Sequence, residues 1–190
     1  IDTTYRKKRA KVTYALTQNQ PYIIDGISYD FRDRFLEPIL SPDTVNCLIH
    51  NGDIYNVATL DAERERIATM LKNRGYYNFS VNNIEYRVDT LGGNRQVGIR
   101  MIVKRNITGY DERGRAISEN NRIYRISEIN VIPDYDPAQN ESERIASLSD
   151  TTYYEGLNII SHGSKPNVRP AVLHTAIPLT PNATYNASQV

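Results

Sequence analysis

The side chains best suited to chemistry in this sequence are three histidines and one cysteine, and their spacing argues against catalysis. His50, His162 and His174 fall in three separate segments, and none has the partner spacing of a metal-binding histidine pair. Cys47 has only His50 nearby as a candidate base, and a free cysteine is more often buried and inert than nucleophilic. We expect loop histidines and a buried thiol. A hydrolase with a histidine-based or acidic site is the alternative, and it would need a pocket that unites distant segments.

Two further motifs resemble ion sites but lack essential parts. Asp134-x-Asp136 lies in an acidic stretch, yet the glycine and the terminal glutamate of an EF-hand calcium loop are missing. Gly92-Gly93 is predicted to be a turn pair, because no Lys-Ser/Thr and helix follow it as in a phosphate-binding loop. We therefore expect no catalytic residue, no metal and no cofactor.

The composition narrows the possible partners. The 190 residues contain 23 Lys and Arg against 22 Asp and Glu, so the net charge of +1 supplies no basic field for nucleic acid. No apolar run is long enough for a membrane helix, and a single cysteine excludes an internal disulfide framework. The chain starts at Ile1 rather than Met, and we expect it to be a piece of a longer protein.

The clearest predicted element is a helix over residues 56–74. Asn56 suits the N-cap, and Gly75 fits a left-handed cap at the C-terminal end. The opposite face of the helix is charged. The apolar positions recur at helical spacing: Leu60, Ile67, Ala68, Met70 and Leu71.

Two alternating segments after this helix predict a β-hairpin. Gln96–Val103 keeps a strict period of two, and residues 89–94 read as the turn before it. The segment Phe79–Val88 changes phase part-way, and a bulge near Asn82-Asn83 would let both apolar sets face the core. We expect Tyr77 and Phe79 to be core residues.

A strand and a short helix are predicted ahead of the long helix. The strand spans Tyr22–Phe31, and the short helix runs over about 34–40, with Pro42 ending it. We expect one side of the strand to carry its apolar residues, namely Ile23, Ile27, Tyr29 and Phe31. The element order is thus strand, helix, helix, strand, strand.

The chain also repeats itself. The stretch 22–29 aligns with 124–131 at an offset of 102, and Gly52–Val57 aligns with Asn182–Ala187 at an offset of 130. The second copy therefore carries 28 extra residues, which we place in the polar stretch 134–161. It stops where its long helix should begin. We interpret the chain as a segment of a tandem array of such units.

Three stretches carry a family resemblance: Tyr22-Ile23-Ile24-Asp25-Gly26-Ile27, Gly52-Asp53-Ile54-Tyr55-Asn56, and the helix end Gly75-Tyr76-Tyr77-Asn78-Phe79. With the element order above, they resemble the polypeptide-transport-associated (POTRA) domains of outer-membrane protein assembly factors. The loops are most similar to BamA/TamA-like proteins of the Bacteroidetes group, including the TamL lipoproteins. The resemblance implies an α+β fold of tandem β-α-α-β-β modules, each a three-stranded mixed sheet with two helices on one face.

This resemblance divides the chain into four parts. We expect residues 1–18 to hold the terminal strand of a preceding module, and residues 19–105 to be a complete module. Residues 106–121 would be a linker, although their charged, aperiodic sequence also fits a turn between strands. Residues 122–190 would begin a following module, with the insertion at about 134–161.

The functional expectation is a sheet edge rather than a pocket. An unpaired edge strand can accept an extended peptide as an added strand, and in family members the second strand is such an edge. Proline at Glu85 should then remove an edge donor. The predicted protein-binding residues follow the strand: Ser80, Val81, Asn82, Asn83, Ile84, Glu85, Tyr86, Arg87 and Val88.

The implied partners are unfolded outer-membrane β-barrel proteins and subunits of an assembly machine. The location implied is the periplasm, with attachment to the outer membrane through parts outside this fragment. No covalent chemistry and no nucleic acid is expected. The alternative is a purely structural spacer arm that positions other proteins without binding clients.

Overall fold

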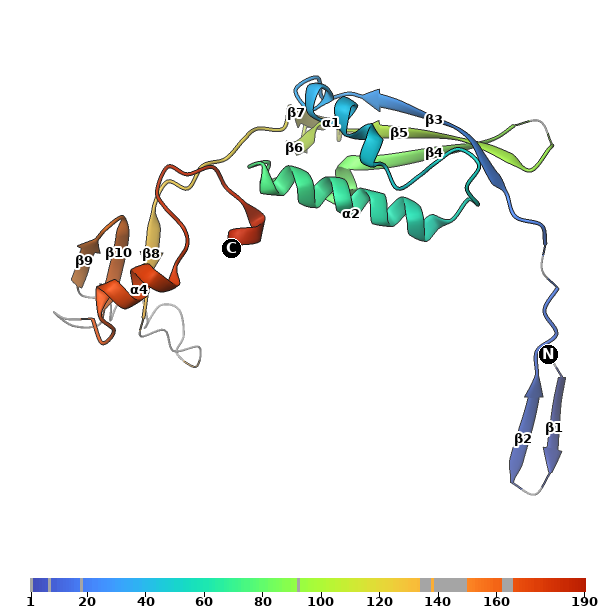
Figure 1. The fold of residues 1–190 in the computed structure, drawn as a ribbon, viewed down its shortest axis with the longest axis horizontal. Helices are drawn as coiled ribbons and strands as arrows, with labels where there is room; N and C mark the ends of the chain where they lie inside the picture. Colours follow the sequence, from blue (N-terminus) through green and yellow to red (C-terminus); the bar gives the residue numbers. More distant parts are fainter. Residues whose placement is uncertain are drawn as a thin grey trace.

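The computed structural model describes residues 2–6, 8–17, 19–91, 93–133, 138, 150–161 and 166–190. Figure 1 shows a central sheet with its helices, a smaller second sheet and a separate N-terminal hairpin. Asp134-x-Asp136, Gly92, His162 and most of the predicted insertion lie outside the described residues.

The central unit has the predicted order of strand, helix, helix, strand, strand. It comprises β3 (Ile23–Phe31), α1 (Glu37–Asp43), α2 (Val57–Asn73), β4 (Ile84–Leu91) and β5 (Gln96–Val103), with short 3₁₀ turns η1 (Thr44–Asn46) and η2 (Val81–Asn83). The strand order is β3-β5-β4, with β5 parallel to β3 and antiparallel to β4. The predicted three-stranded mixed sheet is confirmed for this unit.

Both helices pack on one face of this sheet. Leu40 of α1 and Leu71 of α2 join Met101 of β5 in one buried cluster. A second cluster joins Leu60 of α2 to Ile99 of β5. The strict alternation of β5 is what makes this possible, because its odd-numbered residues all point towards the helices.

The long helix follows its sequence signals closely. The Asn56 side chain accepts a hydrogen bond from the Ala58 N–H at 2.9 Å, as an N-cap residue does. At the other end Gly75 has φ +97°, the left-handed conformation that glycine adopts without strain.

The short helix is displaced from its predicted position. It begins at Glu37 rather than near residue 34, because Pro38 favours the first helical turn. It also continues through Pro42 to Asp43, so the prediction that Pro42 ends it was wrong. Pro42 lies next to the helix end, where its missing N–H removes few intrahelical bonds.

The bulge occurs in a different strand from the predicted one. Residues 81–83 form the 3₁₀ turn η2, so β4 starts at Ile84 and has no bulge at Asn82-Asn83. The register shift lies in β3, between Ile24 and Gly26. As a consequence Ile24, not Ile23, is the buried residue at the start of β3.

The predicted linker contains a β-hairpin. Strands β6 (Asn106–Tyr110) and β7 (Ala116–Glu119) pair antiparallel around the charged residues 111–115. The charged residues 111–115 therefore form a turn between strands, the alternative to a linker that the sequence left open, and the linker role itself stays a prediction. At the N-terminus, β1 (Asp2–Arg6) and β2 (Arg9–Thr13) form another antiparallel hairpin, where we expected one terminal strand within residues 1–18.

The second unit holds a smaller mixed sheet. Its strands are β8 (Ile129–Val131), β9 (Asp150–Tyr154) and β10 (Leu157–Ser161), and the order β8-β10-β9 has the same parallel and antiparallel pattern as the central sheet. Helix α4 (Pro170–Ala176) and turn η3 (Ala187–Gln189) follow. In the described part, the hairpin precedes α4, so the β-α-α-β-β order is not reproduced here.

The loop hydrogen bonds of the two units nevertheless correspond at the predicted offsets of 102 and 130. The Ile24 N–H donates to the Asp53 carbonyl, and the Ile126 N–H donates to that of Ala183. Four further features match in the same way. The β-bridge between Ile23 and Ile54 corresponds to the bridge between Arg125 and Thr184, and the N-cap Asn56 corresponds to the N-cap Asn186. The bonds from the N–H groups of Tyr55 and Gly52 to the carbonyls of Tyr22 and Ile24 correspond to those from Tyr185 and Asn182 to Tyr124 and Ile126.

Candidate protein-interaction edge

Strand β4 is an edge strand whose outer side has no partner among the described residues. The Lys104 N–H donates to the Asn83 carbonyl at 2.7 Å, which fixes the hydrogen-bonding phase of the β4–β5 pair. Because antiparallel bonding alternates, Glu85, Arg87 and Asp89 direct their backbone groups to β5. The backbone groups of Tyr86, Val88 and Thr90 therefore point to the free edge.

This phase corrects the expectation for Glu85. Its N–H belongs to the ladder with β5, so a proline there would break the sheet rather than block the edge. A proline at Val88 or Thr90 removes an edge donor instead.

The opposite edge of the sheet is partly closed. The Ile24 N–H donates to the Asp53 carbonyl and the Gly52 N–H donates to the Ile24 carbonyl, so the loop before α2 covers the beginning of β3. Among the described residues the outer side of β4 has no partner along its whole length, whereas the start of β3 is bonded to this loop.

The predicted site residues divide into a turn and a strand. Ser80, Val81, Asn82 and Asn83 lie in or beside η2, where the Asn83 side chain accepts hydrogen bonds from the Ser80 N–H at 2.9 Å and its hydroxyl at 3.2 Å. These four residues therefore end the edge and do not extend it. The strand portion consists of Ile84, Glu85, Tyr86, Arg87 and Val88.

Three edge residues were missed by sequence reasoning. Asp89, Thr90 and Leu91 belong to β4, with Leu91 opposite Gln96, and the hairpin turn is correspondingly shorter. The polar pair Asp89-Thr90 next to two glycines resembles a turn. The continued alternation of Val88 and Thr90 was the signal for strand.

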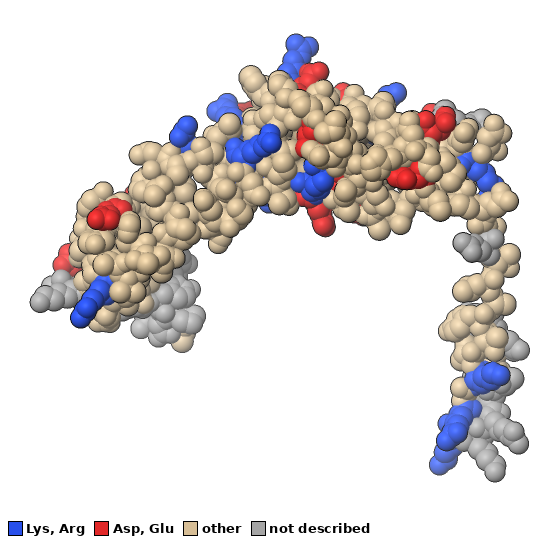
Figure 2. Space-filling model, in the orientation of Figure 1, with Lys and Arg blue, Asp and Glu red and all other residues tan. Residues whose placement is uncertain are grey.

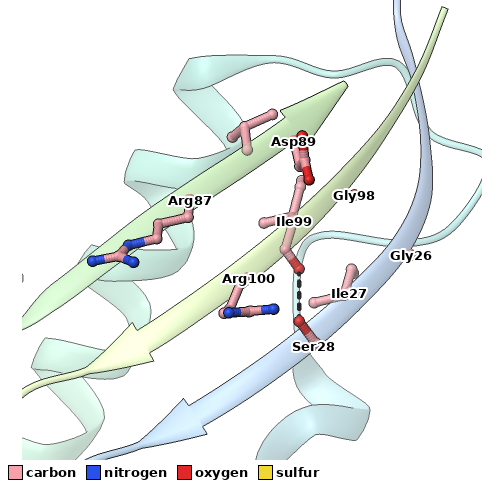
Figure 3. A pocket seen from close by; sticks show the side chains of 9 residues that line it. Gly26, Ile27, Ser28, Arg87, Asp89, Gly98, Ile99 and Arg100 are labelled. Atoms are coloured by element: carbon pink, nitrogen blue, oxygen red, sulfur yellow. Dashed lines mark hydrogen bonds between the residues drawn. The ribbon is translucent and has the colours of Figure 1, made fainter. Parts of the chain in front are cut away.

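The uncovered face of the sheet carries a shallow depression beside this edge. It has a volume of about 520 Å³, and Gly26 and Gly98, which are register partners on β3 and β5, form part of its lining. Figure 3 shows Arg87 and Arg100 along one side of it and Asp89 on the other. Arg87 and Arg100 are direct cross-strand neighbours. A strand added to β4 would place alternate side chains next to this charged rim.

Charges elsewhere on the surface are mixed. On the face drawn in Figure 2, Lys and Arg side chains alternate with Asp and Glu over the body of the molecule. On β4 itself Arg87 pairs with Glu85 at 3.3 Å. Such charges discourage unspecific edge-to-edge pairing.

The residues considered for catalysis do not converge. His50 contacts Asp53 and His174 contacts Glu155, both as exposed pairs in different units. Burial raises the pKa of the Cys47 thiol, which is the opposite of nucleophilic activation. Within the described ranges, no group of three or more metal-ligating side chains could hold an ion.

One buried ion pair has a structural role. The Glu63 carboxylate is 1% exposed and accepts two hydrogen bonds from Arg66, both at 2.8 Å. It also accepts the Leu48 N–H at 3.1 Å, and Arg66 reaches Asp43 of α1 at 2.8 Å. This bidentate pair links α2 to α1 and to the loop between them.

The end of α2 contacts the second unit. The Tyr124 N–H donates to the Gly75 carbonyl at 2.8 Å, and the Asn78 side chain donates to the Tyr124 hydroxyl at 2.6 Å. The Tyr77 ring meets the Tyr185 ring edge-on at 5.0 Å. Phe79 is a core residue as predicted, but Tyr77 is 55% exposed and belongs to this joint. We call these contacts the α2-end joint.

Comparison with known proteins supports a protein-interaction role for the central unit. Residues 21–106 match a family model described as "POTRA: Surface antigen variable number repeat", so a POTRA domain is found there. No curated protein matches the chain. POTRA domains are generally non-catalytic protein-interaction modules of outer-membrane assembly or secretion factors, where they typically form periplasmic arms. No helix in the described ranges is both long enough and apolar enough to cross a bilayer.

Proposed function

We propose that this chain is part of a periplasmic arm of an outer-membrane assembly or translocation factor. In this proposal the arm binds nascent β-barrel proteins or partner subunits by adding a client strand to the free edge of β4. The observation that carries the proposal is the row of unpaired backbone groups at Tyr86, Val88 and Thr90.

Main-chain pairing suits such clients. Backbone N–H and C=O groups are the same in every sequence, so an edge strand can accept many unfolded β-rich chains. The charged rim at Arg87, Asp89 and Arg100 would then favour clients with complementary polar side chains.

We also propose that the chain contains POTRA modules in tandem. The matching loop hydrogen bonds and N-caps of the two units support a second POTRA module that begins at about residue 122. Hairpin β1–β2 would be the last hairpin of a preceding module, because β4 and β5 also form an antiparallel hairpin. The BamA/TamA-like or TamL assignment remains part of this proposal.

A spacer arm is the second candidate. The α2-end joint supports it, because backbone and aromatic contacts between consecutive units favour a fixed geometry. Such an arm would position other proteins and bind no client.

The test replaces Val88 by proline. Val88→Pro removes one free-edge donor and leaves the bonds to β5 in place, whereas Val88→Ala changes the same side chain and keeps the donor. Photocrosslinking of an unfolded outer-membrane β-barrel protein to the arm should fall strongly for Val88→Pro and persist for Val88→Ala. Circular dichroism checks folding, and Thr90→Pro, nearer the strand end, is the second variant. Crosslinking that persists in a folded proline variant excludes pairing at the β4 edge, whereas an unaltered chain that crosslinks no client favours the spacer.

A further inference from the structure

The central unit carries, at its N-terminal end, the same surface that the second unit uses in the α2-end joint. In the second unit this surface is formed by Tyr124, Thr184 and Tyr185. By the offsets of 102 and 130, the corresponding residues of the central unit are Tyr22, Ile54 and Tyr55. The loop bonds that shape the surface are present in both: Tyr55 N–H to the Tyr22 carbonyl, and Tyr185 N–H to the Tyr124 carbonyl, each at 2.9 Å.

The two surfaces differ in occupancy. The Tyr124 N–H donates to the Gly75 carbonyl, but the Tyr22 N–H forms no hydrogen bond with any described residue. Ile54, which forms a β-bridge with Ile23 next to Tyr22, is 59% exposed, and Val57, three residues further along the chain, is 56% exposed. The central unit therefore presents a free backbone donor and two exposed aliphatic residues in the segments that form this surface. We call Tyr22, Ile54 and Val57 the N-terminal docking patch.

We propose that this patch binds the end of the long helix of a preceding module in the parent protein. The inference rests on the proposed tandem arrangement. The occupant would be a helix end like residues 73–78: a left-handed glycine whose carbonyl accepts the Tyr22 N–H, followed by an exposed aromatic ring.

The chemistry of the patch fits this occupant in two respects. A glycine permits close approach, since a Cβ at Gly75 would lie 2.6 Å from the Thr184 methyl group. Ile54, which stands in place of Thr184, offers a larger apolar contact for a ring. The joint is nevertheless small, because Tyr124 is still 41% exposed within it. We expect modest affinity, sufficient between covalently linked modules where the effective concentration is high.

Amide hydrogen exchange tests the proposal in two chains: residues 1–190, and the parent chain extended upstream by one module. The Tyr124 amide should be protected in both. The Tyr22 amide should exchange freely in the 190-residue chain and about tenfold or more slowly in the extended chain. Val57→Asp should remove the added protection at Tyr22, while Val45→Asp, at another exposed aliphatic residue, should leave it.

Several results would overturn the proposal. If the Tyr22 amide exchanges freely in the extended chain, the helix end of a preceding module does not bind the patch. The same conclusion follows if the upstream sequence lacks a helix end with a glycine followed by an aromatic residue. Protection at Tyr22 that rises with the concentration of the 190-residue chain identifies a second copy instead. An unprotected Tyr124 removes the joint on which the inference is based. Client crosslinking is a separate measurement, so failure here does not depend on failure of the β4 edge.

Discussion

At the scale of single residues, Gly75 combines a backbone role with a contact role. Its φ of +97° ends α2, and its missing side chain admits Thr184 and Ile123 of the second unit. Gly52 has a similar φ of +90°, but a Cβ there would meet nothing within 4 Å. A side chain at position 52 would therefore meet backbone strain alone, whereas a side chain at position 75 would meet both strain and a steric clash.

We predict that Gly75→Ala is more destabilising than Gly52→Ala. Both substitutions place a Cβ at positive φ, at a cost of about 1 kcal/mol or more. Gly75→Ala adds the clash with Thr184 and Ile123, and should also speed amide exchange at Tyr124. Urea denaturation and exchange of the two variants measure the difference. Equal losses, with Tyr124 unaffected, would show that the contact has no energetic weight.

Tyr86 is a partly buried residue whose phenol oxygen is buried. Its hydroxyl has no hydrogen-bond acceptor or donor among the described residues, and the Arg64 guanidinium lies 5.1 Å from the ring centroid. Burial, followed by the nearby Glu63 carboxylate, raises the pKa of this phenol. The folded state thus favours the neutral form.

This raised pKa predicts a loss of stability at alkaline pH. The stabilising preference for neutral Tyr86 is fully present below the pKa of about 10 of an unfolded tyrosine, and is lost as pH rises from there towards the higher folded pKa. Tyr86→Phe should keep stability at pH 7 within about 0.5 kcal/mol, because no hydrogen bond is removed. It should also weaken the alkaline loss in urea titrations between pH 7 and 11. An unchanged pH profile would contradict this assignment.

At the scale of elements, the sequence is most informative where local signals agree with the core. Helix α2 was predicted to within a residue at each end because its N-cap, apolar spacing and C-terminal glycine coincide. Strand β5 was predicted to the residue, since it is the central strand with one face against both helices. Hairpin β6–β7 was missed because short, exposed strands have no buried face to impose a pattern.

The start of β4 was misplaced because a side chain there acts on the backbone. Phe79 to Val88 looked like one strand with a phase change, but Asn83 caps the Ser80 N–H and turns the chain. The tertiary bond from Lys104 to the Asn83 carbonyl then fixes where the strand begins. No sequence pattern reports that contact.

We predict that Asn83→Ala destabilises the domain by about 1–2 kcal/mol. The substitution removes the acceptor for the Ser80 N–H from a side chain that is 8% exposed. Asn82→Ala is the matched control, since Asn82 is exposed in the same turn and should change stability by less than about 0.5 kcal/mol. Urea denaturation measures both. Similar values for the two variants would mean that Asn83 does not define the start of β4.

At the scale of the whole molecule, the two units have the same pattern of loop hydrogen bonds and contact each other at the α2-end joint. The joint consists of one backbone hydrogen bond, the bond from Asn78 to the Tyr124 hydroxyl, the bond from the Ser188 N–H to the Asn73 side chain at 3.1 Å, and a group of tyrosine rings. A further contact lies at the same end of the central unit, where the buried Asp33 carboxylate accepts two hydrogen bonds from Asn121, just before the second unit. Tyrosine suits such a joint, because its ring packs while its hydroxyl stays wet.

The joint predicts energetic coupling between Tyr77 and Tyr185. Their edge-to-face contact at 5.0 Å should contribute about 0.5–1.5 kcal/mol beyond the burial of either ring. A double-mutant cycle with Tyr77→Ala and Tyr185→Ala, read by urea denaturation, should therefore be non-additive by that amount. Tyr110→Ala is the control, because this exposed ring on β6 has no ring contact to Tyr185 and its effect should simply add. If the Tyr77 and Tyr185 effects also add, the rings do not couple the units, and the hydrogen bonds of the joint would have to hold it alone.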